Sequence, residues 1–284
     1  MTAPEAVDRR WITAYGELAK LPAFFRRDLL VAWSYRTAFF SDWTNLGVQV
    51  LIFALVGRLV DPQVLPDFGG GSTSYVAFVT VGIAVTSFMQ VALGRVVNAL
   101  RNEQLMGTLE SVLVTPTSPT TIQLGSVMYD LAYVPVRTTL FLLVASGVLA
   151  VDLELGGLGP ALIVLLSFIP LVWGLGVVSA AAVLTLRRGA GIVGLAISAL
   201  TIGSTTYFPL GVLPHWAQGV VALNPLTMTL EAARQSLLGG GGWSDVWGTV
   251  VRLIPMAIIS LAVGLAAFRW ALRRERRKGT LAIY

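Results

Sequence analysis

The sequence predicts an all-α polytopic membrane protein with six transmembrane helices. Of its 284 residues, 55% are hydrophobic and only 12% are charged, whereas soluble domains carry about a quarter charged residues. Six apolar runs approach the roughly 20 residues that a helix needs to cross a hydrocarbon core of about 30 Å. The uncharged run 155–186 lacks the alternation of a β-barrel strand, so helices are the remaining way to satisfy the backbone in lipid.

The apolar runs divide the chain into three parts. The predicted spans lie near residues 37–60, 74–95, 123–150, 158–185, 190–211 and 247–270. We therefore expect an N-terminal segment at 1–36, a transmembrane domain at 37–272 and a basic tail at 273–284. Small residues in the fourth and fifth runs, such as Gly174, Gly191 and Gly194, permit close contact between helices.

The distribution of charge predicts the orientation. Lysine and arginine gather before the first run, after the second, between the fourth and fifth, and after the sixth. With six spans these four places share one side, which the positive-inside rule makes cytoplasmic. We therefore expect a multi-pass protein of the cell membrane with both termini in the cytoplasm. The opposite side carries mainly Asp61, Asp67, Asp152, Glu154 and Asp245. The pI near 9.9 then reflects topology and contact with anionic membrane lipids, and we expect no nucleic acid partner.

The N-terminal segment has the composition of a helix that lies on the membrane surface. It is charged throughout and lacks the apolar core of a signal peptide. From Ala23 to Ala38, aromatic residues alternate with Arg26, Arg27 and Asp28, which predicts an amphipathic interfacial helix. A simple flanking anchor for the first span is the alternative. Because the chain has no cysteine, disulfides and cysteine-based metal sites are excluded.

The interval 95–123 is the one sizeable polar segment between two apolar runs. Leu105 and Leu109 recur at helical spacing, and Thr115 and Pro116 stop the pattern, which predicts a short amphipathic helix over about 99–116. A soluble partner would meet the chain mainly here or at its termini. An ordinary amphipathic connector between membrane helices is the alternative.

The chain lacks the residues that catalysis would require. Its only lysines, Lys20 and Lys278, do not follow a glycine, so a phosphate-binding loop of the GxxxxGK[ST] type is excluded. His215 is the only histidine and belongs to no metal motif, and no GxSxG motif is present. We therefore expect no catalytic residue, no bound metal and no cofactor on this chain.

Two ionisable residues lie inside the third apolar run. Asp130 and Arg137 are two helical turns apart on one face, with Pro135 between them. Charge inside a membrane usually faces the bundle interior or a hydrated path. A role in transport and a purely structural pair both remain open.

The segment after the fifth run is apolar but interrupted. Pro209, Pro214 and Pro225 break it, and Gly239–Gly242 ends it. Short helices over about 207–242 that enter the outer leaflet and return would explain both the apolarity and the breaks. The glycines are expected to form a flexible joint.

Three stretches resemble the membrane subunits of ABC-2 type exporters of the daunorubicin-resistance kind. They are FFRRDLLVAWSYRTAFF, EQLMGTLESVLVTPTSPTTIQLG and YFPLGVLPHWAQGVVALNPLTMTLEAAR. The resemblance implies that the middle stretch is a cytoplasmic coupling helix that docks on a separate nucleotide-binding subunit, through Glu103, Met106, Gly107, Thr108, Leu109, Glu110, Thr115 and Pro116. It also implies outer re-entrant helices that contain Pro209, Leu213, Pro214, Asn224, Pro225 and Arg234.

This resemblance implies an ATP-driven permease that moves an amphipathic drug, lipid or lipid-linked glycan out of a bacterial cell. ATP and Mg²⁺ would bind the partner ATPase, and a second permease subunit would complete a homodimer or heterodimer. One alternative is a proton-coupled secondary transporter that uses Asp130 and Arg137. Another is a membrane assembly or sensor subunit that transports nothing. Among these, the exporter alone requires a nucleotide-binding protein to copurify.

Overall fold

The computed structural model describes residues 19–34, 36–59, 65–66, 74–105, 121, 125, 128–148, 151, 153–186 and 189–278. Within these ranges the regular structure is helical and contains no strand, so the predicted all-α class is confirmed. The helices are α2 (Leu21–Ser34), α3 (Arg36–Val56), α4 (Tyr75–Leu105), α7 (Met128–Val148), α8 (Leu158–Thr185), α9 (Gly189–Ile202), α10 (His215–Ala222), α11 (Pro225–Leu238) and α12 (Trp243–Lys278).

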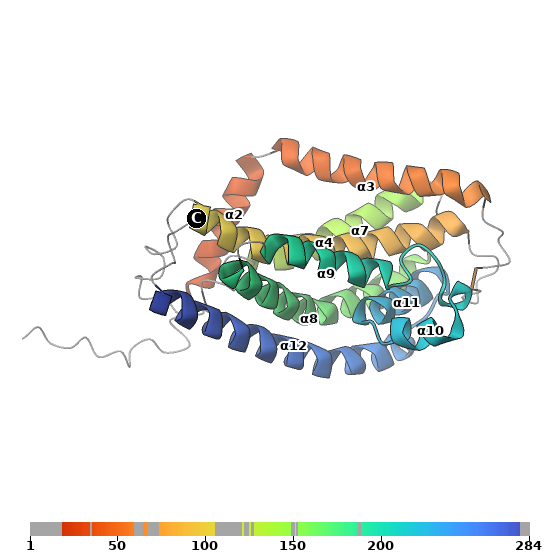
Figure 1. Ribbon diagram of the computed structural model, residues 1–284. Coiled ribbons are helices and arrows are strands. Elements are labelled where there is room, and N and C mark those ends of the chain that lie inside the picture. The colour runs from red at the N-terminus through yellow and green to blue at the C-terminus, as the bar shows by residue number, and fades with distance from the viewer. Residues whose placement is uncertain are drawn as a thin grey trace, which may run out of the picture.

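The long helices run side by side and leave the short ones at the two ends of the bundle. Figure 1 shows α10 and α11 at one end, which we call the α11 end, and α2 at the other, the α2 end. The last turns of α4 and α12 also lie at the α2 end. Successive long helices therefore run up and down the bundle.

The six predicted apolar runs overlap α3, α4, α7, α8, α9 and α12. In the described part of the chain, Leu155–Thr185 and Trp243–Arg274 are each long and apolar enough to cross a membrane. Four shorter helical stretches are also apolar: Trp43–Leu59, Tyr75–Val91, Ala132–Gly147 and Val193–Ile202. The helices fit a membrane protein, and the number of spans stays a prediction.

The fifth run differs from its predicted bounds. It was expected to continue to residue 211, but α9 ends at Ile202 and residues 203–208 form a turn. Ser204, Thr205 and Thr206 in this turn are buried against other helices, and hydrogen bonds with distant residues replace those of a continued helix. Hydropathy alone does not register such a break.

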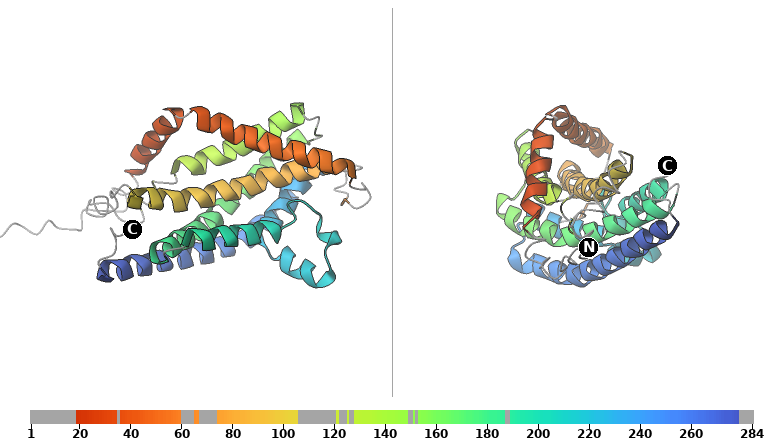
Figure 2. Two further views of the ribbon diagram at one scale, coloured as in Figure 1. Left: turned by 45° about the horizontal axis from the view of Figure 1, so that its top comes forward. Right: turned by 90° about the vertical axis from the view of Figure 1, so that its left-hand side faces the viewer.

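The helix α4 forms the centre of the bundle. From Ala77 to Thr86 every residue is buried, and the end-on view in Figure 2 places α4 among the other helices. Phe78 and Phe88 are among its fully buried side chains, and Phe88 lies against Phe168 of α8 with ring centroids 6.4 Å apart. In a membrane bundle such side chains stabilise the fold through close van der Waals packing, so α4 supplies many of the core contacts.

Glycines bring α8 and α12 into close contact. A Cβ atom at Gly174 would collide with Ser260, and one at Gly264 would lie 2.6 Å from the carbonyl oxygen of Gly174. The Ser260 hydroxyl donates to the carbonyl of Leu171 at 2.9 Å. By contrast, Gly191 and Gly194 of α9 have open space around them, so this part of α9 is loosely packed in the single chain.

The glycine segment 239–242 forms a hydrogen-bonded turn, which corrects the expected flexible joint. The backbone amides of Gly239 and Gly241 donate to the Gln235 carbonyl at 3.2 and 3.0 Å, and that of Gly242 donates to Asp245 at 2.9 Å. Gly240 has a φ of 63°, a conformation that glycine adopts without strain. The turn therefore fixes the direction in which α12 starts.

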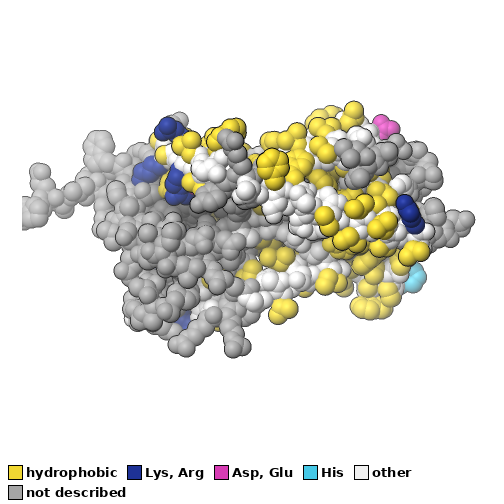
Figure 3. All heavy atoms as spheres, turned by 90° about the horizontal axis from the view of Figure 1, so that it is seen from above, with side chains coloured by type: hydrophobic (Ala, Val, Ile, Leu, Met, Phe, Trp, Pro, Cys, Tyr) yellow, Lys and Arg dark blue, Asp and Glu magenta, His cyan; other side chains and the backbone are white. Residues whose placement is uncertain are grey.

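The charged side chains divide between the two ends. Arg26 and Arg27 lie on α2 and Arg277 on the last turn of α12, whereas Glu154 and Asp245 lie near the opposite end. Figure 3 shows most of the blue side chains at the α2 end, a further blue side chain at the α11 end, and hydrophobic side chains over much of the rest of the described surface. This polarity is the pattern on which the predicted orientation rests.

Candidate functional site

The predicted coupling interval is described only at its beginning. Residues 99–105 continue α4 without a break, so Glu103 lies on the last turn of that long helix and not on a separate one. The other coupling candidates lie outside the described residues: Met106, Gly107, Thr108, Leu109, Glu110, Thr115 and Pro116. Their role stays a prediction.

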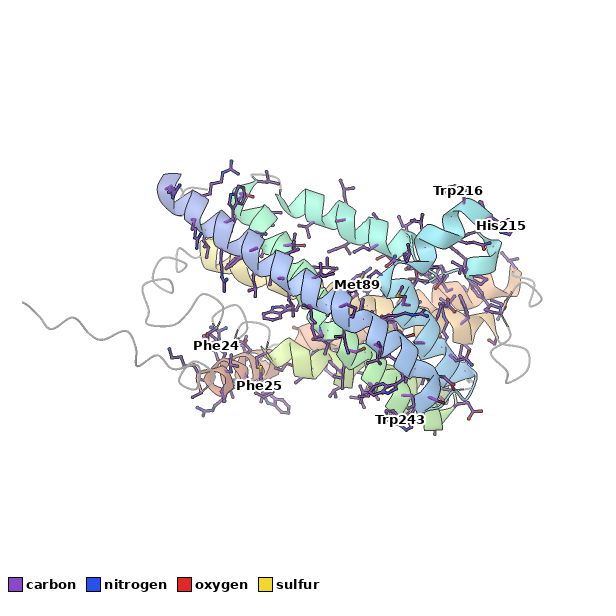
Figure 4. The ribbon with its side chains drawn as sticks, turned by 90° about the horizontal axis from the view of Figure 1, so that it is seen from below. Phe24, Phe25, Met89, His215, Trp216 and Trp243 are labelled. Atoms are coloured by element: carbon purple, nitrogen blue, oxygen red, sulfur yellow. The ribbon has the colours of Figure 1, made fainter. Side chains whose placement is uncertain are left out.

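The helix α2 packs against the residues that follow this interval. A Cβ atom at Gly125 would lie 2.5 Å from the ring of Phe24. The ring of Phe25 lies 6.1 Å from that of Tyr129, which stacks on Tyr133 at 5.3 Å. The aromatic side chains of α2, labelled in Figure 4, thus connect it to the start of α7.

The charged side chains of α2 are mostly exposed. Arg26 is exposed, and Arg27 pairs with Asp28 at 2.7 Å and lies over the ring of Phe24 at 5.3 Å. Exposed pairs of this kind contribute little stability. Aromatic contacts join α2 to the bundle, while its outside carries Arg26 and Arg27 together with the exposed Leu30 and Trp33. Its place at the membrane surface stays a prediction.

Asp130 and Arg137 both lie on α7, seven residues apart and on either side of Pro135. Arg137 is 3% exposed, so this cation lies in the interior of the bundle. The Asp130 side chain is outside the described part of the structure, and a direct pair between the two stays a prediction.

Arg234 of α11 is fully buried and joins three parts of the chain. Its Nε donates to the Phe78 carbonyl of α4 at 3.2 Å, and its Nη2 donates to the Thr206 carbonyl at 3.0 Å. Nη1 contacts the Thr205 hydroxyl at 3.3 Å and a Glu231 carboxylate oxygen at 3.4 Å. The guanidinium also stacks on the Phe78 ring, 3.5 Å from its centroid. The planar fork of arginine suits this combination of acceptors and an aromatic face.

The charge of Arg234 is compensated locally. Burial lowers the pKa of Arg234 to about 10, and the attraction of Glu231 opposes that decrease, so the guanidinium stays protonated at neutral pH. The Glu231 side chain is 37% exposed and accepts a hydrogen bond from the Thr205 hydroxyl at 2.8 Å. Glu231 therefore links the buried cation to the surface of the α11 end.

A cluster of hydroxyl groups adjoins Arg234. The hydroxyl of Thr206 lies 2.8 Å from that of Thr86 on α4 and 2.7 Å from that of Ser204. Ser204 donates in turn to the Thr201 carbonyl at 2.6 Å. A Cβ atom at Gly82 would collide with the Thr206 carbonyl oxygen, so glycine at this position lets the turn reach α4.

Asn224 binds the end of α9 and the first residue of the turn 203–208. Its Oδ1 accepts from the Leu226 amide at 3.0 Å, and its Nδ2 donates to the carbonyls of Leu200 at 2.9 Å and Gly203 at 2.7 Å. Pro225 follows in the first turn of α11, where a proline needs no amide hydrogen. Asn224 thereby caps α11 and also ties it to the end of α9.

The remaining outer candidates lead into α10. Pro209 is buried and precedes a short 3₁₀ helix at Leu210–Val212. Leu213 and Pro214 follow, and the Leu213 carbonyl accepts a hydrogen bond from Gln218 at 2.8 Å. His215 and Trp216 start α10 with exposed side chains, labelled in Figure 4. Among the described residues, no group of His, Asp and Glu could hold a metal ion.

Polar side chains are exposed on three otherwise apolar helices. They include Asn45 of α3, Gln90 of α4 and Ser198 of α9. Figures 1 and 2 show α4 lying between α3 and α9. We call the exposed side chains of these three helices the open face. Its amides are poorly suited to direct contact with hydrocarbon.

The comparison with known proteins gives the family. No curated protein matches the chain. The family model of the ABC-2 type transporter matches residues 20–238, a range that begins just before α2 and ends with α11. Such chains are membrane-embedded permease components of ABC-type transporters, are not ATPases themselves, and work with an ABC ATPase subunit. Because the match covers well over half of the sequence, this chain belongs to the ABC-2 type transporter family.

Proposed function

We propose that this permease is the membrane subunit of an ATP-driven exporter that moves an amphipathic drug, lipid or lipid-linked glycan outward. The family match over residues 20–238 is the observation that carries the proposal. The sequence has no phosphate-binding loop, so ATP and Mg²⁺ would bind the partner subunit. Six spans would leave both termini in the cytoplasm, with the α2 end facing the ATPase.

The ATPase would act on the interval from Glu103 to Pro116. Two contacts support a mechanical role there. The first is α4, which leads from Leu105 directly into the buried core. The second is the packing of Phe24 on Gly125, which links α2 to the chain just after the interval. A push on the interval would therefore reach both α4 and α7.

A second permease subunit would cover the open face. Asn45, Gln90 and Ser198 are exposed there, and an uncompensated amide in hydrocarbon is costly. A partner subunit would enclose these groups and create a polar path between the two copies. In this arrangement α10 and α11 form the outer re-entrant region at the exit.

The proposal is tested by purifying the tagged permease from its native membrane and identifying its partners. An ABC ATPase should copurify, and its hydrolysis rate should change when it is reconstituted with the permease in vesicles. Transport of candidate cargoes should require ATP and should persist when the proton gradient is collapsed. A permease that transports without any ATPase and stops when the gradient is collapsed would support the secondary transporter instead.

A further inference from the structure

The helix α12 presents one exposed face to the surroundings of the bundle. Figure 4, viewed from below, shows α12 in front of the other helices, and Figure 1 places it on the side opposite α3. The middle of this face is apolar and includes Val251, Ile259 and Val263. Trp247 and Trp270, each more than half exposed, lie on either side of the apolar stretch. They are about 35 Å apart along the helix, close to the roughly 30 Å of a hydrocarbon core, and tryptophan favours the two membrane interfaces.

At the α2 end the same face becomes basic. Arg269, Arg273 and Arg277 follow one another at intervals of one helical turn, and all three side chains are exposed. We call this row the α12 basic stripe. It is about 12 Å long, so it passes from the hydrocarbon boundary at Trp270 through a headgroup layer about 5–8 Å deep. Arg274 lies over the Trp270 ring at 5.2 Å and holds that ring beside the stripe.

Packing on α8 fixes the direction in which the α12 basic stripe points. On the other side of α12, Phe268, Ala271 and Leu272 are buried in a cluster with residues of α8. The close contact between Gly264 and Gly174 precedes this cluster. These contacts hold α12 in one rotation, so the arginines face away from the bundle. The stripe is therefore a preformed part of the lateral surface of the permease.

The chemistry of the stripe favours a phosphate group as its ligand. Of the carboxylates whose side chains are described, Asp28 pairs with Arg27 on α2 and the others lie toward the α11 end. Each guanidinium of the stripe can bind a phosphate through two parallel hydrogen bonds. In the headgroup layer, such a phosphate belongs to an acidic phospholipid. The apolar part of the same face accommodates the acyl chains of that lipid.

We propose that the α12 basic stripe is a binding site for an anionic phospholipid in the leaflet at the α2 end. Arg269 and Arg273 bind the headgroup phosphate, Arg277 adds to the attraction, and the acyl chains lie along Ile259 and Val263. Because the site requires these side chains on one rigid face, it differs from the general attraction of basic loops to acidic membranes. The inference does not depend on coupling to an ATPase, and the family match, which ends at residue 238, does not include α12.

Fluorescence quenching at Trp270 identifies the lipid that lies beside the stripe. The full permease is reconstituted in phosphatidylcholine bilayers that contain a minor fraction of either phosphatidylglycerol or phosphatidylcholine brominated on its acyl chains. The chain has eight tryptophans, so the signal of Trp270 is the difference between the native protein and Trp270→Phe. We expect brominated phosphatidylglycerol to quench Trp270 severalfold more than brominated phosphatidylcholine. At Trp247, measured in the same way with Trp247→Phe, the two lipids should quench equally.

Charge variants assign the preference to the stripe. Arg269→Gln/Arg273→Gln should abolish the preference for phosphatidylglycerol at Trp270. The matched control, Arg26→Gln/Arg252→Gln, removes two exposed arginines from α2 and from the first half of α12 and should keep the preference. Arg269→Lys/Arg273→Lys retains the charge without the planar fork and should keep part of the preference. The lysine variant covers the case in which the glutamine variant does not insert.

Several outcomes would overturn the inference. One is equal quenching of Trp270 by the two brominated lipids in the native permease, and another is an equal loss of preference in the control variant. Displacement of the brominated lipid by inorganic phosphate, but not by chloride at the same ionic strength, would indicate a site for the free anion. A glutamine variant that keeps its lipid preference but no longer copurifies with the ATPase would instead identify the stripe as a protein-docking surface.

Discussion

At the scale of single residues, Arg234 shows how a cation can be buried in a membrane protein at a tolerable cost. Two backbone carbonyls, a hydroxyl, a carboxylate and an aromatic ring surround it. Its Phe78 partner is 156 positions away in the sequence. The resemblance of the sequence to known exporters predicted that Arg234 lies in the outer region, but no local pattern could predict its burial, because its partners come from distant segments.

Replacing Arg234 with methionine should lower the free energy of unfolding by about 3 kcal/mol or more. The substitution leaves two carbonyls without their donor and removes the charge that compensates Glu231. The midpoint of thermal unfolding in detergent provides the measurement. As a control, Arg252→Met removes an exposed arginine from α12 and should change the midpoint little. Equal effects of the two substitutions would mean that the Arg234 cluster adds no special stability.

Gly82→Ala should separate the turn 203–208 from α4. The new methyl group would meet the Thr206 carbonyl oxygen and would lie 2.9 Å from Nη2 of Arg234. We expect destabilisation by about 1–3 kcal/mol, the usual range for overpacking. Gly94→Ala on the same helix is the control, since nothing lies within 4 Å of its added Cβ. The midpoint of thermal unfolding is measured for both variants. An unchanged midpoint for Gly82→Ala would contradict the close contact between Gly82 and the turn.

At the scale of the helices, the sequence predicts well those that depend on local composition. The apolar run 158–185 has the same bounds as α8, and the aromatic and basic residues near Arg26 indicate the amphipathic α2. The predicted end of the fifth run was wrong because Thr205 and Thr206 fit an apolar run in composition but form hydrogen bonds with residues of α4 and α11. Tertiary hydrogen bonds, which hydropathy does not contain, decide that boundary.

Gly125→Ala tests whether α2 takes part in coupling. The added methyl group would press on the Phe24 ring close to its backbone and should displace α2 from the start of α7. We expect normal insertion in the membrane and near-normal ATP hydrolysis, but at least severalfold slower transport per ATP. On the same helix as Tyr129, Gly147→Ala has nothing within 4 Å and should behave like the wild type. An unchanged ratio of transport to hydrolysis in Gly125→Ala would exclude α2 from coupling.

At the scale of the whole molecule, the two ends of the bundle differ in charge and in construction. The α2 end carries arginines and the end of α4, whereas the α11 end carries the buried Arg234 cluster and the exposed α10. Sequence charge alone predicts this asymmetry, because the positive-inside rule acts on whole loops. Which residues contact one another inside each end depends on tertiary packing, which the charge pattern of the sequence does not predict.

Single cysteines can test the topology because the chain has none of its own. Gly219→Cys and Gly242→Cys are exposed positions at the α11 end with open space for a side chain. Both should react with an impermeant thiol reagent added outside intact cells. Leu186→Cys, exposed at the other end of α8, should react only after the membrane is opened. Labelling of Leu186→Cys from outside would reverse or reject the six-span topology.

The continuity of α4 has a geometric consequence. Its 31 residues contain no proline and form a rod about 46 Å long that runs from the α2 end of the bundle to the α11 end. Thr86 lies about 28 Å along this rod from Leu105, so tilting the rod by about 5° about Leu105 displaces Thr86 by about 2.5 Å. Added to the 2.8 Å separation of the Thr86 and Thr206 hydroxyls, a displacement of that size away from Thr206 exceeds hydrogen-bond distance. A small rotation at the α2 end is therefore sufficient to break a polar contact in the other half of the bundle.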